Sequence, residues 1–317
     1  METYYITSSG RLEKEGDALK FSNSEGSDTI PLEAVSNIIV SGNVTITKAA
    51  VSLISGKNIP LFYMSFYGNY ISSLLPEDYL ISGTVIRKQV IASSEMNTRL
   101  VIARSFVLGA ARNMALVARR SGMGKLDIRK SSIEESQEIN SLMGVEGNIR
   151  SEYFELMDGV LPEPFRIGKR VRRPPNNRSN SLIGFLNSIL YAQVASQIFS
   201  THLHPAVSFL HEPFERRTSL SLDVAEIFKP IICDRVLLKL VRLKVIKEED
   251  FENSGVFLTE TGRKKVLKEL DDRMNETVYS SNLRRYISYK HLIKLELYKL
   301  ERHILGEKQY KPFIARS

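Results

Sequence analysis

Residues 85–120 read VIRKQVIASSEMNTRLVIARSFVLGAARNMALVARR, and this stretch decides the fold class. Its apolar residues recur three and four positions apart, which is the periodicity of a helix that buries one face. Similar patterns follow at about 131–143, 146–158, 179–201, 220–245, 258–275 and 282–305. The chain is therefore predicted to be helical after Gly83.

The residues before Gly83 have a different pattern. They form short runs rich in Ile, Val, Tyr and Phe that are separated by Gly, Asn and Ser, as is typical of strands. The runs are TYYITS (3–8), ALKFSN (18–23), TIPLEAVSNIIVSG (29–42), NVTITK (43–48), IPLFYMS (59–65) and YISSLLP (70–76). One short helix is expected at KAAVSLISGKN (48–58), with Gly56 as its end.

These two patterns together predict an α+β protein. We expect a small β-sandwich-like domain at 1–82, a linker near 77–85, and a larger all-helical domain at 83–317. A chain of 317 residues is long enough for two domains.

The charge is divided unevenly between these parts. Residues 1–82 hold five Lys/Arg and nine Asp/Glu, a net charge of −4, while the rest of the chain carries +12. A basic helical domain suits contact with a polyanion such as nucleic acid, although a basic surface without a specific partner would give the same count.

Location and redox state follow from what the sequence lacks. No apolar run approaches the roughly 18–20 residues that span a bilayer, and the N-terminus does not resemble a signal peptide. We therefore expect a cytoplasmic protein. Cys233 is the single cysteine, which excludes an intramolecular disulfide and a cysteine zinc cluster.

The stretch FLHEPFERRTSLSLDVAE (209–226) combines a histidine with acids in an apolar segment. Asp223 and Glu226 are three residues apart, so a helix would place them on one face. Acids beside a core are costly unless they are paired, hydrogen-bonded or bound to a metal. A purely structural alternative is a salt bridge to Arg216, Arg217 or Arg235.

A third acid, Glu146, lies between Gly144 and Gly147, at the expected start of a helix. An acid there can simply favour the helix dipole. Together, Glu146, His211 and Glu226 would form a mixed carboxylate–imidazole set that suits Mn²⁺ or Mg²⁺. The spacing of the three residues does not by itself bring them together.

A basic loop is predicted at PFRIGKRVRRPPNNRSN (164–180), because Pro174 and Pro175 forbid a continuing helix. Guanidinium groups in such a loop can grip phosphates, and the alternative is a solvated connector. Tyr286, Tyr289 and Tyr298 could stack on bases or pack in the protein.

Three ordered motifs carry a resemblance to a known family. They are GVEGNIRSEYF (144–154), RRPPNNRSNSLIGFLNSILYAQV (172–194) and FLHEPFERRTSLSLDVAEIFKP (209–230). With further similarity from YYITSSGRLEKEGDALKF near the N-terminus to the C-terminal helix, the chain resembles the CRISPR-associated integrases, the Cas-one family. These proteins are the catalytic subunits of the spacer-acquisition complex.

The resemblance implies an N-terminal β domain that forms a homodimer and a helical domain with a Mg²⁺ or Mn²⁺ site of Glu146, His211 and Glu226. It places Asp223 at the edge of that site and Asn180 in a supporting role. Whether His211 ligates the ion or carries a proton stays open. Lys229 stands where the family often has Arg.

The activity implied is a metal-dependent DNA endonuclease and integrase that inserts short spacers into a repeat array by transesterification, together with a small partner subunit, Cas-two. The residues expected to grip DNA are Arg87, Lys88, Arg166, Lys169, Arg170, Arg172 and Arg173. Two alternatives are a non-catalytic DNA-binding scaffold with a structural acidic cluster and a hydrolase of small phosphoesters.

Overall fold

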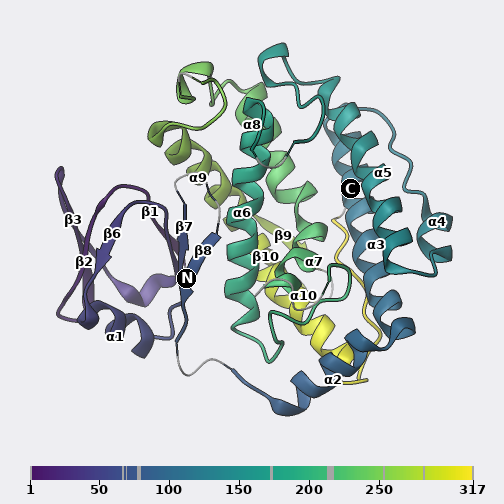
Figure 1. Cartoon of the computed structure of the whole chain (residues 1–317), viewed down its shortest axis with the longest axis horizontal. Coiled ribbons are helices and arrows are strands. Elements are labelled where there is room, and N and C mark those ends of the chain that lie inside the picture. The colour runs from purple at the N-terminus through teal and green to yellow at the C-terminus, as the bar shows by residue number, and fades with distance from the viewer. Residues whose placement is uncertain are drawn as a thin grey trace. The chain divides into compact units, whose positions relative to one another are not determined.

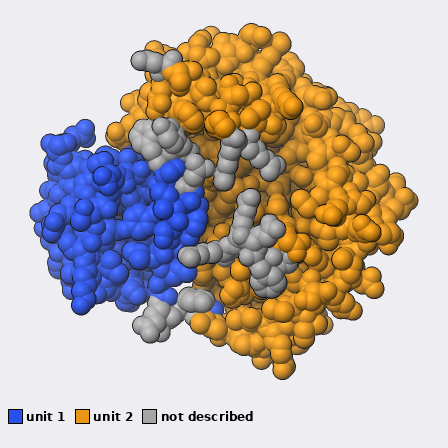
Figure 2. All heavy atoms as spheres, viewed as in Figure 1, with its two compact units in different colours: residues 1–80 blue, residues 81–317 orange. Residues whose placement is uncertain are grey.

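The structure is a computed structural model that describes residues 2–65, 68, 70–76, 80–171, 174–212, 218–252, 254–280 and 283–315. The chain divides into two compact units, Met1–Leu80 and Ile81–Ser317 (Figure 1 and Figure 2). The division falls two residues before the boundary expected from the sequence.

The first unit contains two four-stranded sheets. One has the order β1 (Glu2–Ile6), β5 (Val35–Val40), β7 (Leu61–Met64) and β8 (Tyr70–Leu74). The other has the order β4 (Gly26–Ile30), β3 (Ala18–Asn23), β2 (Gly10–Glu15) and β6 (Val44–Ile46). Strands β1, β5 and β7 are parallel, and β8 joins β7 antiparallel.

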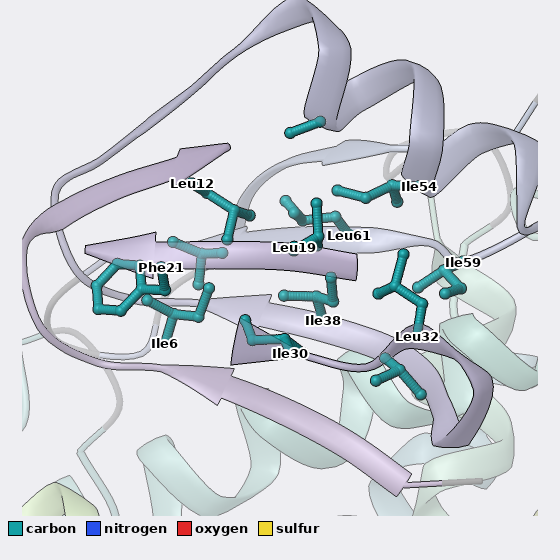
Figure 3. Close-up of a cluster of buried hydrophobic side chains, with 13 residues drawn as sticks. Ile6, Leu12, Leu19, Phe21, Ile30, Leu32, Ile38, Ile54, Ile59 and Leu61 are labelled. Atoms are coloured by element: carbon teal, nitrogen blue, oxygen red, sulfur yellow. The ribbon is translucent and has the colours of Figure 1, made fainter. Parts of the chain in front are cut away.

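One apolar cluster unites the two sheets and helix α1 (Lys48–Gly56) (Figure 3). Leu12 and Leu19 come from one sheet, Ile38 and Leu61 from the other, and Ile54 from α1, and all five are almost fully buried. Burial of this apolar surface is the main stabilising contribution to such a fold. Helix α1 begins where the Thr47 side chain accepts a hydrogen bond from the backbone of Ala50, and it ends at Gly56, as expected.

The sequence did not predict β2 and most of β4. Their residues, GRLEKE and GSDTI, are mainly polar and carry few of the branched and aromatic side chains that mark a strand. Both strands pair antiparallel with β3, which contributes Leu19 and Phe21 to the core. Each strand also places one fully buried residue in the core, Leu12 from β2 and Ile30 from β4.

The second unit is mainly helical, and the α+β fold class is confirmed. Its helices are α2 (Gly83–Ser94), α3 (Met96–Arg120), α4 (Lys130–Glu135), α5 (Ile139–Asp158), α6 (Arg178–Ile198), α7 (Ser219–Phe228), α8 (Arg235–Arg242), α9 (Glu260–Asn275) and α10 (Tyr289–Ile304). Short 3-10 turns occur at Glu163–Phe165 and Glu248–Asp250.

Helix α3 corrects the expectation about apolar runs. By length and composition alone its 25 residues could cross a membrane. However, 61 % of its most apolar window is buried inside the protein. Phe106 and Met114 are among its fully buried side chains, so α3 packs as a core helix in this structure.

Several other boundaries differ from the predicted ones. The helix expected at 85–120 is divided at Glu95 into α2 and α3, and the helix expected at 131–143 ends at Glu135, with α5 beginning at Ile139. The expected helix at 220–245 is interrupted by a π-helical segment, Pro230–Asp234, because Pro230 has no backbone N–H to continue the helical ladder. The first residues of the expected helix 282–305 instead belong to a hairpin of β9 (Thr277–Ser280) and β10 (Arg285–Ser288). The unit is therefore not entirely helical.

Candidate active site

The imidazole of His211 is oriented by a buried carboxylate. Asp223, on α7, has no exposed surface, and its Oδ1 lies 2.7 Å from His211 Nδ1. The same carboxylate accepts backbone N–H groups from Phe209 at 2.6 Å and from Leu210 and His211 at 2.9 Å. A tautomer that donates from Nδ1 keeps the lone pair on Nε2, the arrangement found in histidines that ligate metals.

Helices α2 and α3 hold the carbonyl groups of the same loop. Gln89 donates to the carbonyl of Val207 at 2.7 Å, and Ser93 donates to that of Ser208 at 2.6 Å. Arg99 Nε donates to the carbonyl of Phe209 at 2.8 Å. The loop before His211 is thus hydrogen-bonded on both sides, by α7 and by α2 and α3.

One arginine joins the two predicted glutamates. Arg150 Nε donates to Glu146 Oε1 at 2.7 Å, and its Nη2 donates to Glu226 Oε2 at 2.5 Å. Lys229 forms a further ion pair with Glu226. The structure therefore brings Glu146, from α5, and Glu226, from α7, to a single guanidinium.

The surroundings of Glu146 differ from those expected. Helix α5 begins at Ile139, so Glu146 lies two turns inside the helix and not at its start. The helix dipole acts mainly within the first turn, so it does not explain this acid. A Cβ added at Gly144 or Gly147 would meet no atom within 4 Å, so the helix surface beside these two glycines is open.

Burial and neighbouring cations set the ionisation of this cluster. Burial opposes ionisation of Glu226, but Lys229 and Arg150 outweigh it and lower the pKa of the carboxyl to about 2. Burial also opposes the charge of Arg150, yet Glu226 and Glu146 raise the pKa of its guanidinium. Both charged forms are therefore stable at neutral pH.

His211 and Asp234 respond to burial in different ways. Burial disfavours the charged imidazole, but the hydrogen bond and the charge of Asp223, together with Glu226, raise the pKa of His211. Burial raises the pKa of Asp234 to about 6, although Arg150 and Lys229 act against this shift. Asp234 is a titratable group near the cluster that no sequence motif indicated.

The donor chemistry can be compared with the needs of a divalent ion. Within the described ranges, no three His, Cys, Asp or Glu side chains are grouped as a metal-binding cluster. The types of donor nevertheless fit, because two carboxylates share one guanidinium and the nearby imidazole is supported by Asp223. An ion bound to both glutamates would have to take over oxygens that now accept from Arg150 and Lys229.

Asn180 has a different role from the one predicted. Its side chain accepts from Arg170 Nη1 at 2.9 Å and donates to the carbonyl of Lys169 at 3.0 Å and to Asn176 Oδ1 at 2.7 Å. These partners belong to the basic loop and not to the acidic cluster. Asn180 is almost completely buried, and it fixes the loop to the start of α6.

The cations of the basic loop are not equivalent. Lys169 is exposed, and Arg166 is exposed but paired with Glu163 at 2.8 Å. Arg170 also donates to the carbonyl of Val171 at 2.6 Å, so its guanidinium helps to shape the loop. Arg172 and Arg173 lie outside the described residues.

The two cations expected on α2 also differ. Arg87 is exposed, whereas the ammonium of Lys88 donates to the carbonyl of Leu305 at 3.1 Å, just beyond α10. Lys88 therefore caps a helix end, which is a structural function. The predicted salt-bridge partners Arg216 and Arg217 lie outside the part of the chain that the structure describes.

Comparison with known proteins decides the family. Residues 4–272 match the family described as CRISPR associated protein Cas1. The chain belongs to the Cas1 family. A CRISPR-associated endonuclease Cas1 from Methanothermobacter thermautotrophicus is 42 % identical over 316 residues, which cover 99 % of this chain and 95 % of that protein.

Solved structures agree with this assignment. A CAS1 protein from Thermotoga maritima is similar with a TM-score of 0.87 and 36 % identity, and the match covers 100 % of both chains. A casposase bound to an integration product has the same TM-score of 0.87 at 19 % identity, with 98 % of this chain and 93 % of that chain covered. At that identity the casposase supports the Cas1 fold alone.

Proposed function

We propose that this Cas1-family chain is a DNA endonuclease and integrase. The observation that carries the proposal is the convergence of Glu146 and Glu226 on Arg150, beside a histidine whose orientation is fixed by Asp223. The endonuclease name of the Methanothermobacter relative supports it, and the chain shares its fold with a casposase bound to an integration product.

Glu146, Glu226 and His211 are the residues that we propose to hold Mg²⁺ or Mn²⁺. When bound there, the ion would neutralise charge at the scissile phosphate and lower the pKa of the attacking hydroxyl, either water or a DNA 3′-hydroxyl. Asp223 keeps the imidazole in one orientation, so His211 can also hold a proton at a defined nitrogen. Arg150 and Lys229 supply positive charge beside a phosphate.

The same proposal covers substrate and partners. DNA would contact the exposed Arg166, Lys169 and Arg87, and its backbone would provide most of the binding energy. We also propose a homodimer through the first unit, a complex with the small partner subunit Cas-two, and a cytoplasmic location. The family membership and the acidic first unit support this division of roles.

A second function is favoured by one observation. Arg150 already pairs with both glutamates and Lys229 with Glu226, and such a network forms without a metal ion. A non-catalytic DNA-binding scaffold would contain the same network as a structural element.

One experiment separates the two functions. Purified protein is incubated with branched and linear DNA in Mg²⁺, Mn²⁺ or EDTA, and wild type is compared with His211→Ala and with the isosteric Glu146→Gln. An integrase cuts or joins strands only with the ion, and both variants lose this activity while they still bind DNA. His204→Ala is the control, because this nearby histidine lies outside the proposed site. Ion-independent binding without any strand cleavage or joining by the wild type, also in the presence of Cas-two, would favour the scaffold.

A further inference from the structure

The hairpin of β9 and β10 belongs to the helical unit (Figure 1). It carries two exposed aromatic side chains. Tyr279 is 49 % exposed. Tyr286 is 70 % exposed, which is the highest value among the large apolar and aromatic residues that the structure describes. The two residues are direct partners across the hairpin, with ring centroids 5.4 Å apart and planes inclined at 65°. An edge-to-face pair of this kind leaves ring faces open to solvent.

The hairpin does not need these rings for its attachment to the protein. Side chains alternate between the two faces of a strand, and the neighbouring pair, Val278 and Ile287, lies on the other face. Ile287 is buried and Val278 is half-buried. The apolar face therefore packs on the unit, and the tyrosine face points to solvent.

The charged residues in the hairpin and just after it are all basic. Residues 277–295 contain Arg284, Arg285, Lys290 and Lys294 and no Asp or Glu. Arg284, which directly precedes β10, is exposed and forms no ion pair with a carboxylate of the described residues, whereas Arg285 pairs with Ser280 and shares the face of Val278 and Ile287. Open aromatic faces and a cation without an acidic partner are the two components of a surface that binds single-stranded nucleic acid.

The other tyrosines named from the sequence do not offer such a surface. Tyr289 is buried, and the guanidinium carbon of Arg273 lies 4.2 Å from its ring centroid. Tyr298 is only partly exposed and donates to the carbonyl of Ser200 at 3.4 Å. Of the three tyrosines that the sequence suggested for base stacking, Tyr286 alone has an open ring face. Tyr279, which the sequence did not suggest, provides a second open ring.

We propose that Tyr279 and Tyr286, with Arg284, form a stacking site for unpaired DNA bases. The inference rests on the proposed function, because it gives that DNA substrate a single-stranded end or overhang. Bases inside a duplex are already covered on both faces, whereas an unpaired base can place a face on tyrosine. Arg284 binds a neighbouring phosphate of the strand, so the site is tolerant of base sequence.

The test measures binding by the full-length protein of two labelled probes, a short oligothymidine and a duplex of equal length, through fluorescence anisotropy. The double variant Tyr279→Ala/Tyr286→Ala is expected to weaken binding of the single strand by about tenfold or more, in keeping with the usual loss per stacked base. Duplex binding should change less than about twofold, since the duplex offers no open base face. The matched control, Tyr279→Phe/Tyr286→Phe, keeps both rings and should bind both probes as the wild type does.

A spectroscopic signature separates stacking from a change in folding. 2-Aminopurine in the single strand should be quenched on binding by the wild type and the Phe variant, and less quenched by the Ala variant. Equal affinity and quenching in the Ala variant would overturn the inference, as would equal losses in the Ala and Phe variants. Wild-type binding to the duplex but not to the single strand would overturn this inference alone, whereas binding to neither probe would also overturn the proposed function.

Discussion

Asp223 Oδ1 lies 2.7 Å from Nδ1 of His211, and the carboxylate that makes this contact is fully buried. A buried acid in an apolar helix is costly unless its oxygens are satisfied. Here they are satisfied by the imidazole and by three backbone N–H groups of the loop before α7. The fold therefore uses one acid both to close a loop and to orient a histidine.

Replacing Asp223 by Asn should reduce activity and loosen the loop together. The amide retains the shape but loses the charge and part of the capacity to accept hydrogen bonds. We expect DNA cleavage or joining to fall by about 10–100-fold, the usual cost of losing a residue that supports a ligand. Strand-transfer assays and thermal melting check this, and Glu212→Gln, on an exposed acid nearby, is the control. An active variant with wild-type melting would show that the contact is dispensable.

Replacing Arg150 by Met should destabilise the helical unit strongly. The variant leaves Glu146 without its cation and Glu226 with Lys229 alone. Removing one partner from a buried ion pair costs about 3–5 kcal/mol. Urea denaturation followed by circular dichroism measures the loss. The double variant Arg150→Met/Glu226→Gln should recover part of it, and an unchanged midpoint for Arg150→Met alone would refute the role given to the guanidinium.

Asp234 should make the free energy of unfolding depend on pH in the acidic range. Its folded pKa is about 6, above the ordinary value of 3.8, so the folded protein holds this proton more tightly than the unfolded chain does. The contribution of this group to the free energy of unfolding is greatest below about pH 4. That contribution falls by about 3 kcal/mol as the pH rises to about 6. Urea midpoints of Asp234→Asn should lack this fall, whereas the exposed control Asp127→Asn should keep it. Parallel curves for Asp234→Asn and wild type would contradict the assignment.

A divalent ion should stabilise the folded protein through the proposed ligands. Binding to the folded state alone raises the melting temperature with ion concentration. We expect Mn²⁺ to raise the melting temperature of wild type and EDTA to reverse the effect, with little response from Glu146→Gln or His211→Ala. Because this measurement needs no DNA, it tests the ion separately from activity. The same rise in both variants would place the ion elsewhere.

Exposed cations of the basic loop should determine how binding responds to salt. Each phosphate contact contributes about one unit to the slope of log affinity against log salt concentration. Arg166→Gln/Lys169→Gln should therefore reduce the slope by about two units in duplex DNA binding. Lys48→Gln, on a lysine of the first unit, is the control. A slope equal to that of wild type would exclude the loop as a phosphate contact.

The sequence predicted the change from strands to helices along the chain better than it predicted the contacts between side chains. Apolar periodicity located α3, α6 and α10, because burial of one face determines that pattern. It did not predict that Arg150 would bridge Glu146 and Glu226, since the contact joins side chains 76 positions apart. Local spacing carries no information about such a pair.

The hydrogen bonds around His211 were inaccessible for the same reason. Gln89 and Arg99 reach the loop across more than one hundred residues, and either residue reads locally as a polar position on a helix. Asn180 shows the converse, because a motif predicted its importance while the structure assigned its contacts to the basic loop. The polar sequence of β2 likewise did not indicate a strand, because this strand is stabilised by its pairing with β3.

The ion pairs from Arg150 also have a consequence for the protein during synthesis. Glu146 is synthesised before the other members of its ion-pair network. The network is incomplete until α7 and Lys229 have been synthesised and have folded against α5. A nascent or truncated chain ending before α7 lacks Asp223 and Glu226, so its His211 and Glu146 remain unassembled. The proposed site would therefore be assembled late, and only in chains that have folded across this whole distance.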